Sequence, residues 1–175
     1  MEPTRILEKP GILLVGVSFF GDPFNINAEW SEENEIGRLW NRLFAYMHKH
    51  PHSIKHIANS KIAYEVHVEH EETTLKGYFE VFVGVEVTQL EEVPVELLVK
   101  ILPASTYAVF TLHGQQILSD WSREIYQHWL PGSGYRCAYP YAFQLYDERF
   151  LGLDHLDQSV LDLYIPLHSL NPVRA

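Results

Sequence analysis

The first half of the chain has hydrophobic and polar positions that predict one strand, one helix and two further strands. An apolar run that ends in Gly-Asp-Pro indicates a buried strand, and apolar positions spaced three and four residues apart indicate a helix that Ser31 would cap. Strict alternation predicts two strands joined by a polar turn from Glu71 to Gly77. The expected elements are a strand at 12–20, a helix from about Glu32 to about Lys49, and strands at 62–68 and 78–87.

The second half repeats this order of patterns. Its expected elements are a strand at 107–112, a helix over 117–129 that ends before Pro131-Gly132, and strands at 143–146 and 160–167. We therefore predict an α+β fold of two βαββ units with pseudo-twofold symmetry, in which each antiparallel sheet carries one long helix. The whole chain, 1–175, would be one domain, with a first repeat at about 11–87, a linker at about 88–105 and a second repeat at about 106–170. Within the linker, Val93-Pro94-Val95 is either an edge strand or a crossover.

The alternation also predicts which side chains lie on the sheet faces opposite the helices, where the two halves would meet. A polar and aromatic face of this kind is typical of a small-molecule cleft, but it is equally compatible with an exposed sheet face stabilised by aromatic cross-strand pairs. The residues assigned to this face are Glu65, His67, Glu80, Phe82, Gln144, Tyr146, Asp162 and Tyr164.

Two tryptophans, Trp40 and Trp121, occupy matching positions in the two predicted helices. Each is either a core side chain packed on its sheet or part of the cleft floor, where its ring would stack on a flat or cationic ligand. Together with the eight sheet residues, they complete the predicted ligand-binding set.

Composition narrows the class of protein. The 175 residues include 13 Lys and Arg against 23 Asp and Glu, a formal charge of −10, which argues against direct nucleic-acid binding. We expect no helix-turn-helix with a basic recognition helix before Gly11 or after Leu167, and no apolar run approaches the about 20 residues of a membrane span. The single cysteine and the absence of a signal-peptide pattern lead us to expect a soluble, cytoplasmic protein that binds neither nucleic acid nor membrane.

Metal and cofactor chemistry have weak support in the sequence. The histidines at 48, 50, 52 and 56 fit no standard metal-ligand spacing, because Pro51 interrupts the helix between them. No glycine-rich phosphate loop or serine nucleophile motif is present. We expect no metal, no cofactor and no assignable catalytic residue.

Several segments of the chain resemble one family. They are Tyr107–Gly114, Trp121–Pro131, Gly134-Tyr135, Tyr146–Phe150 and Asp162–Leu167, supported in the first half by Ile36–Trp40 and Phe82–Val87. Together these segments resemble the GyrI-like small-molecule-binding domain, which is the effector-binding domain of AraC-type and MerR-type transcription regulators, here in stand-alone form. The resemblance runs from about Gly11 to Leu167.

The resemblance implies a ligand cleft where the two βαββ units meet, and lipophilic, often cationic ligands. In the family, a pocket acid commonly lies two residues before the Tyr of the Tyr-Asp-x-x-Phe motif, and this chain has Gln144 there. An amide can neither neutralise a cation nor act as a general base near pH 7. Our hypothesis is that Glu65, at the matching position of the first half, or Glu80 supplies the negative charge.

Three functions follow from this sequence. The first is reversible binding of a lipophilic, cationic aromatic molecule by a sensor or sequestering domain. The second is a hydrolase in which Glu65 or Glu80 activates water, which the amide at Gln144 disfavours. The third is an acidic module that, like a gyrase inhibitor, binds a protein partner.

Overall fold

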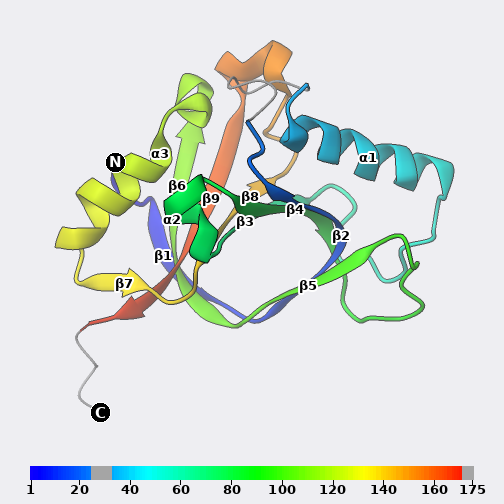
Figure 1. Ribbon diagram of the computed structural model, residues 1–175, viewed down its shortest axis with the longest axis horizontal. Coiled ribbons are helices and arrows are strands. Elements are labelled where there is room, and N and C mark those ends of the chain that lie inside the picture. Colours follow the sequence, from blue (N-terminus) through cyan, green and yellow to red (C-terminus); the bar gives the residue numbers. More distant parts are fainter. Residues whose placement is uncertain (25–32, 171–175) are drawn as a thin grey trace. The chain divides into compact units, whose positions relative to one another are not determined.

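The computed structural model describes residues 1–24 and 33–170, and the chain divides into two compact units (Figure 1). One unit is Gly11–Pro103, and the other joins Met1–Pro10 to Ala104–Ala175. We call them the 11–103 unit and the 104–175 unit. The predicted linker therefore folds almost entirely with the 11–103 unit. The single-domain assignment and the origin of the units by duplication remain predictions.

The 11–103 unit is an antiparallel sheet with one long helix. Its elements are β2 (Ile12–Gly21), α1 (Glu35–Lys49), β3 (Ala63–Glu69), α2 (Glu71–Lys76), β4 (Phe79–Glu86) and β5 (Leu98–Leu102). The strands lie in the order β5-β2-β4-β3. Four strands and a helix of 15 residues confirm the predicted α+β class for this unit.

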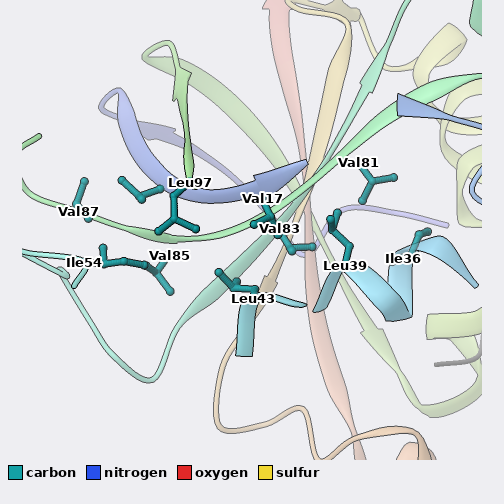
Figure 2. Close-up of a cluster of buried hydrophobic side chains, with 11 residues drawn as sticks. Val17, Ile36, Leu39, Leu43, Ile54, Val81, Val83, Val85, Val87 and Leu97 are labelled. Carbon is teal, nitrogen blue, oxygen red and sulfur yellow. The ribbon is translucent and has the colours of Figure 1, made fainter. Parts of the chain in front are cut away.

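Helix α1 covers one face of this sheet because its apolar side chains form a single stripe. Ile36, Leu39 and Leu43 are buried, and Figure 2 shows them beside valines of β2 and β4. The valines of β2 and β4 in this buried cluster are Val15, Val17, Val81, Val83 and Val85. The face they define is called the helix face, and the opposite side of the same sheet is called the far face.

Two local predictions in this unit need correction. Helix α1 begins at Glu35, because the Asn34 side chain accepts a hydrogen bond from the backbone N–H of Gly37 at 2.9 Å and caps the first turn. The predicted cap Ser31 and start Glu32 lie outside the described residues. The predicted polar turn is instead the short helix α2, which ends where Gly77 adopts a left-handed φ of 72°.

The 104–175 unit is also built on antiparallel strands. Its strands are β1 (Arg5–Lys9), β6 (Ser105–His113), β7 (Tyr135–Cys137), β8 (Tyr141–Tyr146) and β9 (Val160–Ser169). They lie in the order β1-β6-β9-β8, and β7 pairs with β9. The sequence patterns predicted neither of the short strands β1 and β7. In the linker the edge strand is β5, not the Val93–Val95 segment.

The helical layer of the 104–175 unit is less regular than predicted. In place of one helix over 117–129 there are four short segments, listed in chain order as 3₁₀-helix η1 (Gly114–Leu118), α3 (Trp121–Arg123), π-helix η2 (Glu124–Trp129) and 3₁₀-helix η3 (Leu130–Gly132). A further 3₁₀-helix, η4 (Leu153–Gln158), precedes β9. Ile117 and Ile125 nevertheless pack on Phe110, Leu112 and Leu163, so the helical apolar stripe is retained. This packing defines the helix face of the 104–175 unit.

In the part of the chain that the structure describes, no helix is long and apolar enough to cross a membrane.

Candidate functional site

The strand register divides the predicted sheet residues of the 11–103 unit between its two faces. Directly paired residues of an antiparallel ladder lie on the same face. Glu65 pairs with Val83 and His67 with Val81, so both lie on the helix face. Glu80 and Phe82 alternate with these valines and lie on the far face, as predicted. The assignment of Glu65 and His67 to the face opposite the helix was therefore wrong.

The same division holds in the 104–175 unit. Gln144 pairs with Leu163 of the helix-face core, and Tyr146 packs against that core. Asp162 and Tyr164 lie on the far face, where Tyr164 pairs with Phe143. The assignment of Gln144 and Tyr146 to a common face with Asp162 and Tyr164 was also wrong.

A buried carboxylate lies on the helix face of the 11–103 unit. Glu65 is 0% exposed, and its Oε2 accepts a hydrogen bond from Trp40 Nε1 at 2.6 Å. His67 Nε2 lies 2.7 Å from Glu65 Oε1. We call Trp40, Phe44, Glu65 and His67 the Glu65 cluster. A carboxylate removed from water needs such charge-assisted hydrogen bonds, and here a helix and a strand supply them.

Further aromatic rings pack against the two side chains that contact this carboxylate. The Phe44 ring stacks on Trp40 with 5.4 Å between centroids, although 55% of Phe44 is exposed. The ring of His67 lies 5.3 Å from that of Phe79. Sequence reasoning missed Phe44; its signal was the spacing of four residues from Trp40, which brings two side chains together on a helix.

The corresponding residues of the 104–175 unit carry no charge. Trp121 packs against the helix-face core, and Gln144 is 2% exposed. The Tyr146 hydroxyl donates a hydrogen bond to Gln144 Oε1 at 2.8 Å, and its ring makes an edge contact with Phe150. An amide and a phenol thus stand where the first unit has a carboxylate and an imidazole.

The alternative acid, Glu80, is already paired on the far face. Its carboxylate accepts hydrogen bonds from Lys100 Nζ and from the Ser18 hydroxyl, both at 2.6 Å. Burial opposes ionisation of Glu80, but these hydrogen bonds outweigh it and hold its pKa below the ordinary value. Phe82, its predicted aromatic neighbour, is 0% exposed and belongs to the core.

Asp162 forms a comparable group on the far face of the 104–175 unit. It accepts hydrogen bonds from Thr111 at 2.7 Å, Arg149 at 2.9 Å and Arg5 at 3.0 Å. Burial raises the pKa of Asp162, but Arg149, Thr111 and Arg5 outweigh burial and lower it overall. Neither Arg5 nor Arg149 could be predicted as a partner of Asp162, because these contacts join residues that are 157 and 13 positions apart along the chain.

Tyr164 lies in an aromatic cluster of this far face. Its ring stacks on Phe143 with 4.5 Å between centroids, and Lys9 Nζ lies 5.4 Å above it. Tyr164 is 4% exposed. Its packing is that of a core residue, and its role in ligand binding remains a prediction.

The histidines after α1 make separate contacts. His50 packs its ring against Tyr46, and His56 Nε2 lies 2.8 Å from Glu91 Oε2. Among the described residues, no three His, Cys, Asp or Glu side chains gather in an arrangement that could hold a metal ion.

The chain resembles known effector-binding proteins in sequence and in fold. Residues 5–167 match the family model Cass2, described as integron-associated effector binding protein. The transcriptional regulator BrlR of Pseudomonas aeruginosa is 32% identical over 94% of this chain and 55% of its own. The chain thus spans about half the length of this curated relative.

Two solved structures share the fold at low sequence identity. SAV2435, solved bound to tetraphenylphosphonium, is 15% identical with a TM-score of 0.68, over 99% of this chain and 98% of its own. The integron cassette protein VCH_CASS2 of Vibrio cholerae is 16% identical with a TM-score of 0.59, over 94% and 95%. The matched family model and the shared fold confirm the resemblance drawn from the motifs: the chain is a GyrI-like effector-binding domain and belongs to the Cass2 family of integron-associated effector binding proteins.

Proposed function

We propose that this effector-binding domain binds a lipophilic, cationic aromatic small molecule at the Glu65 cluster, for sensing or sequestration. The observation that carries the proposal is the carboxylate of Glu65, which is 0% exposed and bound to Trp40. A buried negative charge beside stacked aromatic rings attracts a delocalised cation through both Coulomb and cation–π interactions.

Two further facts support Glu65 over Glu80 as the acid. Glu80 already has the ammonium group of Lys100 at 2.6 Å, so a ligand cation would have to compete with a built-in one. Glu65 has a neutral indole donor at Trp40 and a histidine whose charge depends on protonation. The relative SAV2435 was solved with a lipophilic phosphonium, which makes that cation a suitable first probe.

The test is a calorimetric titration of tetraphenylphosphonium into the wild type and Glu65→Gln at pH 8. Removal of the charge is expected to weaken binding by about 10- to 100-fold, the equivalent of one charge-assisted contact. The control is Glu80→Gln, which removes an acid of the far face and should change the affinity by less than about twofold.

Two results would contradict the proposal. Equal affinity of the wild type and Glu65→Gln would exclude Glu65 as the binding acid, and a loss confined to Glu80→Gln would move the site to the far face. Because Glu65 is buried, circular dichroism and a thermal melt must first show that the variant is folded at the titration temperature.

A further inference from the structure

The side chain that contacts Glu65 from the same strand, β3, is that of His67, which can gain or lose a proton. His67 is two residues along β3, so its side chain shares the helix face, and its Nε2 lies 2.7 Å from Glu65 Oε1. The His67 side chain is 18% exposed while that of Glu65 is 0% exposed. His67 can therefore exchange protons with solvent, while the carboxylate that it contacts is shielded from solvent.

We infer that His67 is the exchangeable counter-charge of Glu65, so that binding of a cationic ligand at the Glu65 cluster releases a proton from His67. This inference rests on the proposed function, because it names how the same site is regulated. It makes His67 a positioning residue whose protonation state determines how strongly the site attracts a cation.

The charge of the Glu65 carboxylate is balanced both without and with bound ligand. When His67 is protonated and no ligand is bound, its imidazolium balances the charge of the Glu65 carboxylate. With ligand, the cation takes over that role, and one proton passes from His67 to water. Nε2 is the nitrogen that faces Glu65, so the proton that leaves is the one on Nδ1, and the remaining Nε2–H still donates to the carboxylate.

The surroundings of His67 favour such an exchange. Two carboxylates share its face of β3, Glu65 and the exposed Glu69, and the ring of Phe79 from β4 lies at 5.3 Å. On the other side of Glu65, Trp40 of α1 contributes an indole N–H that does not titrate in this range. A second positive charge beside His67 would be repelled strongly in this partly buried position, and loss of the His67 proton removes that repulsion.

The test uses tetraphenylphosphonium, whose own charge is independent of pH. Its affinity for the wild type is expected to fall by about five- to tenfold between pH 8 and pH 5.5, since one linked proton changes affinity by at most about tenfold per pH unit. Calorimetry near pH 6 in buffers of different ionisation enthalpy measures the protons released, and we expect a clear net release in the wild type.

The variant His67→Gln keeps a hydrogen-bond donor for Glu65 but cannot titrate. It should bind tetraphenylphosphonium with little pH dependence and no proton release, and at pH 5.5 it should bind more tightly than the wild type. The matched control is His70→Gln, since His70 lies just beyond β3, is 42% exposed and has its Nε2 3.9 Å from Glu80 Oε2 rather than beside Glu65. That variant should keep the proton release of the wild type.

The outcomes separate this inference from the proposed function. Loss of affinity in Glu65→Gln together with pH-independent binding in the wild type would keep the site and overturn the role of His67. Proton release that persists in His67→Gln would assign the linked proton to another group and also overturn it. Unchanged affinity in Glu65→Gln would overturn the proposed function itself.

Discussion

Gly16→Ala is expected to destabilise the protein by about 3 kcal/mol or more, because the added methyl group would overlap the backbone of a paired strand. Gly16 of β2 lies directly opposite Gly84 of β4 in the strand register. A Cβ atom at Gly16 would lie 1.9 Å from the carbonyl oxygen of Val83 and 2.6 Å from the Cα of Gly84. Both obstacles are backbone atoms of the paired strand, so relief requires the two strands to separate and lose ladder hydrogen bonds.

The measurement is thermal and urea unfolding followed by circular dichroism. A loss of about 3 kcal/mol corresponds to a decrease in Tm of about 6–12 °C for a chain of this size. Gly132→Ala is the matched control, because a Cβ there meets nothing within 4 Å and should leave Tm nearly unchanged. Gly84→Ala, whose Cβ would lie 2.6 Å from the Val15 carbonyl oxygen, provides a second test if Gly16→Ala does not fold. A Gly16→Ala protein as stable as the control would show that this strand pair accommodates the methyl group.

Asp162→Asn is expected to cost about 3 kcal/mol at pH 7 and to make acid unfolding less steep. The Asp162 side chain is 3% exposed and ties Thr111, Arg149 and Arg5 together across three segments of the 104–175 unit. Its pKa in the folded protein lies below the ordinary value of 3.8, so its stabilising effect is fully present above about pH 4. That stabilisation is lost as the pH falls through the lower, folded pKa.

The measurement is the free energy of unfolding between pH 7 and pH 2.5. The wild type should lose stability below about pH 4, and Asp162→Asn should lose less over the same range because it has no carboxylate to protonate there. Asp154→Asn, on the exposed surface of η4, is the control and should follow the wild-type curve. Parallel curves for the wild type and Asp162→Asn would show that Asp162 does not link folding to pH.

Most of the element pattern could be predicted from local sequence. The strands β2, β3, β4, β6, β8 and β9 lie within a few residues of the predicted ranges, and the apolar stripe of α1 was correctly identified. Period-two and period-3.6 patterns are local properties, and they remain visible wherever an element buries one side. The edge strands β1 and β5 were missed because an edge strand has fewer buried positions and so a weaker pattern.

The candidate site was only partly predictable. Trp40, Glu65 and His67 were all selected from the sequence, but their direct contact was not foreseen. The sequence also placed Glu65 and Glu80 on one face, as two candidates for one role. In the structure, Glu65 shares the helix face with Trp40, while Glu80 lies on the far face with Lys100.

The sequence by itself determined the family, the positions of the main strands along the chain, and which residues alternate within each strand. What only the tertiary structure decided is which of the two alternating sets faces the helix. In β3, Tyr64 and Val66 are as deeply buried as Glu65, at 2%, 0% and 0% exposure. When both faces of a strand are covered, the apolar set no longer marks the helix side. The pairing register with Val81 and Val83 then assigns Glu65 and His67 to the helix face. Register is a property of two paired strands, and neither strand encodes it alone.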